Sequence, residues 1–396
     1  MKIDFTKAFC KRDAFLQELM PGHRSFFSFG VENGRRIASS QYPSRLEERK
    51  TETNTDSFRM ERLLKLSLSL FLFLILCGVV SGQELTNSSR NTDEGQERLV
   101  ILDTDWMNDC DDVVALRLLA AAHREKAVKL LGISLNACME ESIRSLDAFA
   151  KYEGIQVPLA LDRSGTDLGK GRYQKNLALY PGMHRNNADA EEAVAFYRRI
   201  LSTTSGQIEI LAIGHLTTLA KLLESSSDAF SPLSGKELVA SKVSHLWCMG
   251  GHWPKGREYN FEYNIKTAKA AAKVCREWPS PITFLGLEVG VRVISGRHLK
   301  EGDLLKKVLS DHGSPNGRES YDPMLVELAL SNDPDKAGYK CVYGRAAVNE
   351  DNKSNYFTRD PNGKHRFVVK RFPNNWYENY LEEKLEKALK TRYKFK

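Results

Sequence analysis

The sequence lacks the patterns that mark several large classes of protein. No pair of its cysteines has C-x-x-C spacing and no cysteine–histidine group has zinc-ligand spacing, which excludes a zinc-finger domain and a dithiol redox motif. No segment repeats at a fixed period, so a repeat architecture is excluded as well. Basic residues do not alternate with aromatic residues along any stretch, so the sequence gives no sign of a nucleic-acid-binding surface.

The chain also has little excess charge where a fold is expected. Its 396 residues have a formal net charge of +7, but residues 1–59 hold 11 basic and 8 acidic side chains, and the hydrophobic segment that follows adds +1. The remainder keeps only about +3. A surplus this small does not favour a partner with a phosphate backbone, so we expect a small-molecule ligand and no nucleic acid.

Only one long hydrophobic run is present. It covers 66–80 and is shorter than the roughly 20 apolar residues that span a bilayer. A basic start at Met60 precedes it and two small residues follow, a pattern typical of a signal peptide over 60–82. Its distance from the N-terminus leaves two interpretations. Either Met60 is the true start, or 63–80 is the uncleaved anchor of a type II membrane protein.

The segments around this run show no folded pattern. Residues 1–59 are polar and rich in Ser, Arg and Glu, which predicts a disordered or non-native extension, and 83–97 is expected to be a linker. Glycosylation sequons at Asn87 and Asn352 agree with export. We therefore expect a secreted glycoprotein with a folded domain over 98–396.

From residue 98 onward the sequence alternates between strand-like and helix-like segments. Short apolar runs predict strands over 99–102, 128–135, 155–160, 208–213, 243–249 and 282–287. Helical periodicity predicts helices over 111–122, 142–152, 190–203, 216–225, 267–276, 324–330 and 377–391. A Pro-Asn-Gly turn at 361–363 predicts a hairpin between two short strands. The alternation predicts an α/β fold with a doubly wound, mainly parallel sheet flanked by helices.

Polar or small residues follow several of the predicted strands. They are Asp103 and Asp105, Asn136, Gly214-His215, Gly250-Gly251 and Glu288. Because the carboxyl ends of parallel strands meet at one edge of a sheet, we expect these residues to build one pocket there.

The densest of these strand ends is 103–112, where five of ten residues are aspartate. Capping the following helix needs only one aspartate. The mutual repulsion of five requires a counter-charge, and clustered carboxylate oxygens suit Ca²⁺ or Mg²⁺. An EF-hand loop is excluded because Asn108 stands where that loop needs glycine. Trp106 and Met107 also depart from the phosphatases that open with Asp-x-Asp.

Four landmarks in the right order make the chain similar to the inosine–uridine-preferring nucleoside hydrolases. They are the Asp-x-Asp and Asp-Asp motifs (103–112), a glycine turn before Leu-Thr (211–217), Met-Gly-Gly with Glu-Tyr-Asn (249–260), and an Asp-Pro pair at a late helix (322–323). The resemblance covers about 99–330. It implies the fold of that family and Ca²⁺-dependent hydrolysis of the N-glycosidic bond of ribonucleosides, which releases the base and ribose.

The resemblance also assigns roles to individual residues. Cleaving the bond builds positive charge on the sugar, which nearby carboxylates stabilise. Asp105 is expected to be the catalytic base, with Asp103 supporting it from behind. The expected Ca²⁺ ligands are Asp105, Asp112, the main-chain carbonyl of Ile213, and Asp322. The expected substrate-binding residues are Asp111 and Asn260 at the 2′- and 3′-hydroxyls, Glu258 at the 5′-hydroxyl, and Asn136, Met249 and Tyr321.

Three departures from the family pattern leave alternatives open. The acid-rich loop is two residues longer, so Asp109 is an alternative to Asp111 at the sugar. A second Glu-Tyr-Asn occurs at 262–264, although the copy at 258–260 lies at the better distance from the next helix. Tyr321 stands where many members have the histidine that protonates the leaving base. Tyrosine is a poor proton donor at neutral pH, and His252 or His215 are the candidate replacements.

Aromatic side chains near these motifs have two possible roles. Trp247, Trp253 and Tyr259 could stack on a base, or they could belong to the ordinary core. The sequence leads to one hypothesis and one alternative: a secreted, Ca²⁺-dependent nucleoside hydrolase, or a catalytically weak homologue that binds Ca²⁺ and nucleosides or sugars. The resemblance also makes a homo-oligomer possible, whereas the preferred base cannot be read from the sequence.

Overall fold

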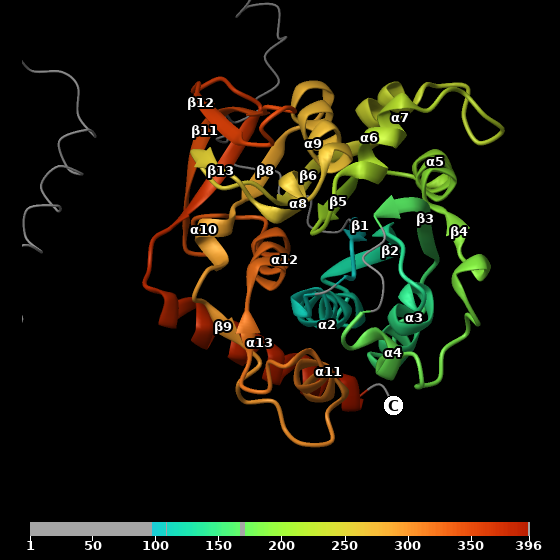
Figure 1. Cartoon of the computed structure of the whole chain (residues 1–396), viewed down its shortest axis with the longest axis vertical. Helices are drawn as coiled ribbons and strands as arrows, with labels where there is room; N and C mark the ends of the chain where they lie inside the picture. Colours follow the sequence, from blue (N-terminus) through green and yellow to red (C-terminus); the bar gives the residue numbers. More distant parts are fainter. Residues whose placement is uncertain (1–96, 108, 167–170, 395–396) are drawn as a thin grey trace, which may run out of the picture. The chain divides into compact units, whose positions relative to one another are not determined.

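The computed structural model of the chain describes residues 97–107, 109–166 and 171–394 (Figure 1). The predictions for 1–59 and 60–82, and for the linker up to residue 96, lie outside the described residues. Within the described ranges no helix is both long enough and apolar enough to cross a bilayer. This finding does not include the 63–80 segment.

The described residues form an 11-stranded sheet in the order β4-β3-β2-β1-β5-β6-β8-β13-β11-β12-β7. All neighbours from β4 to β13 are parallel, and the pairs from β13 to β7 are antiparallel. The strands are β1 Arg98–Thr104, β2 Val128–Ala137, β3 Leu159–Thr166, β4 Glu191–Glu192, β5 Ile208–Ala212, β6 Val243–Met249, β7 Lys255–Gly256, β8 Ile282–Leu285, β11 Tyr339–Val348, β12 Asn355–Arg359 and β13 His365–Lys370.

The strand order reverses at β1, which pairs with β2 on one side and β5 on the other. This is the doubly wound arrangement that the alternating pattern predicted, and the reversal point is where such sheets bind ligands. A small separate sheet joins β9 Ile294–Ser295 to β10 Arg318–Glu319.

Helices cover both faces of the large sheet. One apolar core includes side chains of α2 Asp111–Arg124, α3 Ser142–Tyr152, α11 Leu304–His312, α12 Tyr321–Ser331 and α13 Asn374–Lys394. The other includes side chains of α5 Ala193–Thr203, α6 Thr217–Glu224, α7 Gly235–Lys242 and α9 Ile265–Glu277. Short helices are α4 Gln174–Leu177, α8 Tyr259–Glu262 and α10 Leu287–Gly290.

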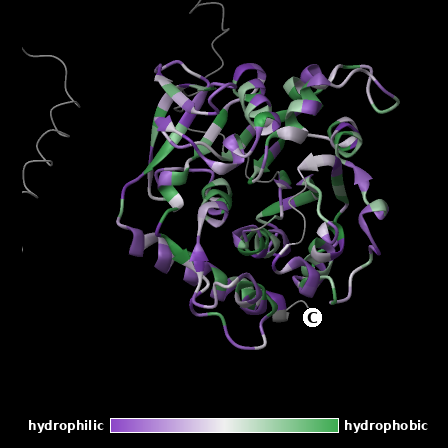
Figure 2. Ribbon diagram, in the orientation of Figure 1, coloured by the Kyte–Doolittle hydropathy of each residue, from purple (hydrophilic) through white to green (hydrophobic). Residues whose placement is uncertain are grey.

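The burial of β1 explains why its sequence is a continuous apolar run. Val100 and Leu102 belong to one core and Ile101 to the other, because successive side chains of a strand point to opposite faces. Figure 2 shows apolar residues gathered in the inner strands and in α2, and hydrophilic residues on the outer helices.

Two predicted elements differ from the structure, and two of its longer helices were not predicted. The strand expected over 155–160 begins only at Leu159 and continues to Thr166. Pro158, just before it, accepts a backbone hydrogen bond from the Ile133 N–H. The helices α7 and α11 were not predicted. The predicted hairpin at 361–363 is wrong, since β12 and β13 flank that turn but β11 lies between them and pairs with both.

Candidate active site

A cavity of about 450 Å³ opens where β1 ends and the strand order reverses, a size that suits a small-molecule ligand. Residues from seven separate parts of the chain line it. They are Asp105, Met107, Asp109, Asp111, Asp112, Arg172, Ile213, Met249, Glu258, Tyr259, Asn260, Leu287, His312, Arg318, Tyr321 and Asp322.

The loop that follows β1 is held by a buried tryptophan. Trp106 has a φ of 51°, which costs a bulky side chain free energy and is typical of functional sites. Its backbone N–H donates to Thr104 Oγ1 at 3.1 Å and to Asp112 Oδ1 at 3.3 Å. Its indole N–H donates to Ser145 Oγ at 3.0 Å. These contacts fix the loop against α2 and α3.

Asp103 lies behind the cavity and is fully buried. Its carboxylate accepts hydrogen bonds from Asn136 Nδ2 at 2.6 Å and from the Tyr197 hydroxyl at 2.8 Å. Burial raises the pKa of Asp103 to about 7. Asn136 also accepts from the His215 N–H at 3.0 Å and does not line the cavity. The residue predicted to touch substrate therefore stands in a supporting layer, where it holds Asp103.

Three carboxylates come together at the N-termini of α2 and α12. Oxygens of Asp111, Asp112 and Asp322 lie within 4.8 Å of one another, and all three residues are buried. Asp111 Oδ2 accepts hydrogen bonds from the backbone N–H groups of Tyr321 and Asp322 at 3.0 and 3.1 Å. Asp112 accepts a hydrogen bond from the Thr104 hydroxyl. These contacts join the start of α2 to the start of α12, although more than 200 residues separate them.

Asp105 lies in the same cavity and is 8% exposed. One of its carboxylate oxygens accepts a hydrogen bond from the Met107 N–H at 3.1 Å. Burial, with a smaller contribution from the negative charges of Asp111 and Asp109, raises the pKa of Asp105 to about 8. Asp105 is not part of the three-carboxylate group, although it was predicted to share a cation with Asp112 and Asp322.

Within the described part of the chain, the four carboxyl groups of Asp105, Asp111, Asp112 and Asp322 have no positive partner. Among the described residues, no lysine, arginine or histidine nitrogen lies within 4.0 Å of any of them. Burial raises the pKa of Asp111, of Asp112 and of Asp322 well above the ordinary value, and their mutual repulsion adds to this. An all-oxygen donor set with unbalanced negative charge fits a hard divalent cation.

The wall from β6 to α8 carries the other predicted substrate-binding residues. Glu258 accepts hydrogen bonds from the N–H groups of Gly251 at 2.9 Å and of Asn260 at 2.7 Å. Burial raises the pKa of Glu258 to about 7. Asn260 Nδ2 donates to the carbonyl of Met249 at 3.2 Å. Met249, Glu258 and Asn260 all line the cavity.

The second Glu-Tyr-Asn copy has a different place. Asn264 caps α9, where its side chain accepts from the N–H groups of Lys266 and Thr267. Neither Glu262 nor Asn264 lines the cavity. The structure thus places the first copy at the cavity and the second at a helix start.

Asp109, the alternative to Asp111, is paired with an arginine. Arg318 donates to its two carboxylate oxygens at 2.8 and 2.6 Å. Both residues line the cavity and are about one-third exposed. Which of Asp109 and Asp111 meets the sugar remains a prediction.

His215 and His252, the candidate proton donors in place of the family's histidine, do not line the cavity. His215 is fully buried against Asn260, with its Nδ1 3.2 Å from the Asn260 carbonyl oxygen, and burial lowers the pKa of His215 to about 4. His252 hydrogen-bonds through its backbone to the Asn355 side chain. Neither ring lines the cavity, whereas Tyr321 does. The Tyr321 hydroxyl donates to Glu319 at 2.9 Å, and burial together with that carboxylate raises the pKa of Tyr321 above its ordinary value.

The three aromatic candidates separate into core and cavity. Trp247 and Trp253 are buried, and their indole N–H groups donate to Glu209 and to the Gly250 carbonyl. Tyr259 is 50% exposed and lines the cavity, so it alone of the three is placed to contact a ligand.

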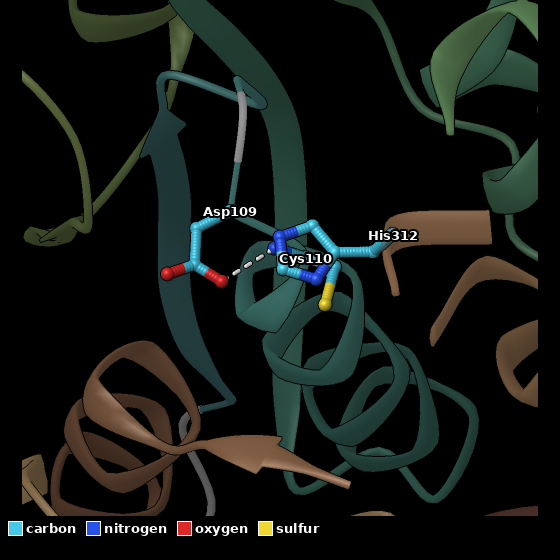
Figure 3. Close-up of side chains that lie close together, drawn as sticks. All are labelled: Asp109, Cys110 and His312. Atoms are coloured by element: carbon cyan, nitrogen blue, oxygen red, sulfur yellow. Dashed lines mark hydrogen bonds between the residues drawn. The ribbon is translucent and has the colours of Figure 1, made fainter. Parts of the chain in front are cut away.

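Sequence reasoning missed Arg172, His312 and Arg318. His312 ends α11, a helix that was not predicted although Asp303 and Gly313 flank it as typical N- and C-terminal caps. His312 forms a second group with Asp109 and Cys110, whose ligand atoms lie within 4.8 Å of one another (Figure 3). This group fits a cation less well, because Arg318 already pairs with Asp109 and because burial and nearby carboxylates raise the pKa of the Cys110 thiol.

Solved structures with the same fold include several nucleoside hydrolases. The family model for inosine-uridine preferring nucleoside hydrolase matches residues 100–335. A structure titled inosine-guanosine nucleoside hydrolase is 16% identical, with a TM-score of 0.55 over 73% of this chain and 99% of that chain. A purine-preferring ribonucleoside hydrolase from Gardnerella vaginalis is 16% identical, with a TM-score of 0.56 over 74% and 99%.

Two further structures agree with this likeness. A plant nucleoside hydrolase is 18% identical, with a TM-score of 0.55 over 73% of this chain and 99% of that chain. An inosine-uridine preferring nucleoside hydrolase from Bacillus anthracis is 16% identical, with a TM-score of 0.56 over 74% and 100%. At these identities the structures establish the fold, while the family model covers more than half of the chain. The chain belongs to the inosine-uridine preferring nucleoside hydrolase family and is a hydrolase that acts on N-glycosyl compounds.

Proposed function

We propose that this protein hydrolyses the N-glycosidic bond of ribonucleosides with the help of a bound Ca²⁺ and releases the free base and ribose. The observation that carries the proposal is the set of four buried carboxyl groups at the reversal point of the sheet, which meet no positive side chain among the residues that the structure describes. Buried carboxylates that serve only to stabilise a fold are normally paired with lysine or arginine side chains. Carboxylates without such partners favour a bound metal cation.

The residues that would hold the ion are Asp105, Asp112 and Asp322 with the main-chain carbonyl of Ile213, and Asp111 is close enough to contribute. When bound, Ca²⁺ supplies positive charge that offsets the carboxylates and acidifies nearby water. Oxygen ligands in this number favour Ca²⁺ over Mg²⁺, which keeps more of its own waters.

Asp105 is the group best placed to act as general base. Its carboxylate is oriented by the Met107 N–H and faces the cavity, where it could accept a proton from a water molecule beside the ion. It would take a proton from the water that attacks C1′. The carboxylates around it would stabilise the positive charge that develops on the sugar as the bond to the base breaks.

The remaining polar side chains would orient the sugar. Asp111 is held by two N–H groups of α12, and Glu258 by two N–H groups of its own loop, so both carboxylates are fixed before a ligand arrives. Such preorganisation lowers the cost of binding a hydroxyl group in one geometry.

One observation favours a second candidate function. Tyr321 replaces the usual proton donor, and its hydroxyl is engaged with Glu319. A chain with the ligand site but without efficient protonation of the base would act as a Ca²⁺-dependent nucleoside- or sugar-binding protein.

Ribose release tests the two candidates. Protein obtained from cells that express the full chain would be incubated with inosine, adenosine, uridine or xanthosine, with and without the chelator EGTA. We expect release that EGTA abolishes and that added Ca²⁺ restores, whereas Mg²⁺ should restore less. Ca²⁺ binding in calorimetry without ribose release from any nucleoside would refute hydrolysis and favour the binding protein.

The same preparation tests the proposed location. We propose that the protein is secreted after cleavage near residue 82, with a membrane-anchored form as the alternative, and that it assembles as a homo-oligomer. Recovery from the medium with an N-terminus near Gln83 supports secretion. Recovery in the membrane fraction with 63–80 intact supports the anchor, and light scattering gives the oligomeric state.

A further inference from the structure

His312 occupies a wall of the same cavity, on an element that the family motifs do not include. It is the last residue of α11, is only 9% exposed, and lines the cavity together with Asp105 and Tyr321. Figure 3 shows its ring beside Cys110 and near the carboxylate of Asp109. Among the residues that the structure describes, no other histidine lines this cavity.

Both ends of α11 fix the position of this ring. At the N-terminus the Asp303 side chain accepts from the Leu305 N–H at 2.9 Å and pairs with the buried Arg117 at 2.6 Å. At the C-terminus Gly313 adopts a φ of 94° and ends the helix. Nδ1 of His312 lies 2.9 Å from the Ser314 hydroxyl oxygen, which orients the ring.

His312 sits at the C-terminal end of α11, the end of a helix that attracts positive charge. Ligand atoms of Asp109 and Cys110 lie within 4.8 Å of a His312 ring nitrogen, and Asp109 also pairs with Arg318. The other charged or titratable groups among the described residues that line the cavity are Asp105, Asp111, Asp112, Arg172, Glu258, Tyr259, Tyr321 and Asp322, so carboxyl groups outnumber arginines there.

A bound base needs a proton donor, and the other candidates are poorly placed. The Tyr321 hydroxyl is occupied by Glu319, and the rings of His215 and His252 lie outside the cavity. A nucleoside whose ribose lies on the carboxylates would have to place its base toward a remaining wall of the cavity. The wall formed by His312, Arg318 and Tyr321 contains one imidazole.

We propose that His312 is the general acid that protonates the leaving base, an inference that rests on the proposed hydrolysis of nucleosides. As the C1′–N bond breaks, its electron pair goes to the base, and the His312 imidazolium donates its Nε2 proton to a ring nitrogen of that base. The oxygen of water forms the new bond to C1′ and its proton passes to Asp105. The imidazole of His312 then regains a proton from solvent, and Asp105 loses its own to solvent.

Leaving groups with and without a need for protonation distinguish this role from a structural one. The full chain and the variants His312→Ala and His312→Gln would be compared on inosine and on p-nitrophenyl β-D-ribofuranoside. The nitrophenolate leaves without a proton. We expect kcat for inosine to fall about 10²–10⁴-fold, the range for losing a general acid. For the nitrophenyl riboside we expect a change of less than about fivefold.

Two control variants accompany the test. His298→Ala removes a histidine that is 79% exposed on the surface, and it should leave both activities unchanged. Tyr321→Phe removes the competing hydroxyl, and it should not produce a loss specific to inosine.

The outcomes distinguish failure of the general-acid role of His312 from failure of the proposed nucleoside hydrolysis. Equal losses on both substrates, no loss on inosine, or an inosine-specific loss in Tyr321→Phe alone would each overturn the role of His312. Wild-type protein that hydrolyses neither substrate would refute the proposed hydrolysis itself. An alkaline limb of the inosine pH profile, where a general acid loses its proton, that disappears in His312→Gln would support the proton donor.

Discussion

The helix α2 carries two buried charge clusters that follow opposite rules. At its N-terminus, Asp111 and Asp112 meet Asp322 without any lysine or arginine within 4.0 Å among the described residues. In its middle, the fully buried Arg117 donates to Glu153 at 2.8 Å and to both oxygens of Asp303 at 2.7 and 2.6 Å. In this second cluster two carboxylates meet two arginines, because Arg124 Nη1 also lies 3.5 Å from a carboxylate oxygen of Glu153.

The difference in charge balance indicates that the Arg117 cluster has a structural role and that the carboxylate cluster has a ligand-binding role. The Arg117 cluster joins α2, α3 and the start of α11, and so it also determines where His312 lies at the other end of α11. The carboxylate cluster destabilises the ion-free fold, because its members repel one another in a poorly solvated place. A fold can keep such a destabilising cluster when a bound cation supplies the positive charge that the side chains do not.

The largest expected effect comes from Asp105→Asn. The amide cannot take a proton from water, so we expect kcat for nucleosides to fall about 10³-fold or more, within or beyond the usual range for a general base. The melting temperature of the ion-free protein should not fall, because one repelling carboxylate has been removed. Asp311→Asn, in a surface pair with Lys307 at 3.0 Å, is the matched control and should retain full activity. Full activity in Asp105→Asn would mean that another group is the base.

Next in size is Arg117→Leu, which breaks the balanced cluster. It removes the arginine that hydrogen-bonds to Asp303 and leaves Glu153 with only the longer contact to Arg124 at 3.5 Å, and we expect a loss of about 3–5 kcal/mol in the free energy of unfolding by urea. Arg185→Leu removes an arginine that is 85% exposed and paired with Asp189, and it should leave the free energy of unfolding almost unchanged. Similar losses in the two variants would contradict a special role for the balanced cluster.

A smaller effect is expected for Asp322→Ala. Loss of one carboxylate ligand should weaken Ca²⁺ binding about 100-fold, which corresponds to about 2.7 kcal/mol, as measured by titration calorimetry. The variant should remain folded, since the repulsion on Asp111 and Asp112 is reduced. Asp333→Ala, just beyond the same helix, is the control. Unchanged affinity in Asp322→Ala would remove this residue from the ion site.

The smallest expected effect is a pH dependence that Glu258 contributes. Burial raises the pKa of Glu258 from 4.5 to about 7, so the folded protein binds more protons than the unfolded chain between those values. Its contribution to stability is therefore greatest below about pH 4.5 and is lost as the pH rises through 7. Between pH 5 and pH 7 we expect a loss of about 2 kcal/mol from this group alone.

Urea midpoints at several pH values check this sign. In EGTA, Glu258→Gln should flatten the decline between pH 5 and pH 7, although the glutamine serves the two backbone N–H groups less well and lowers stability overall. The exposed Glu140→Gln is the control and should keep the wild-type slope. A steeper decline in Glu258→Gln would show that the carboxylate is stabilised rather than destabilised by its site.

Local sequence patterns predicted most of the fold. The strand over 243–249 and the helix over 142–152 agree with β6 and α3 to the residue. The two failures have different causes. The turn at 361–363 has hairpin chemistry, but both neighbouring strands pair with β11, which lies earlier in the chain, and no local pattern specifies that pairing. The helix α11 is short, although its caps and its apolar residues at helical spacing were local signals for it.

The sequence by itself determined that carboxylates gather where β1 ends, because a buried strand must leave the sheet there and the following helix starts with acids. It also determined, through four ordered motifs, which distant segments belong to the site. Only the tertiary structure decided that Asn136 stands behind Asp103, that Arg318 pairs with Asp109, and that His312 joins the cavity. Such contacts depend on how helices pack across hundreds of residues, and no local propensity contains that information.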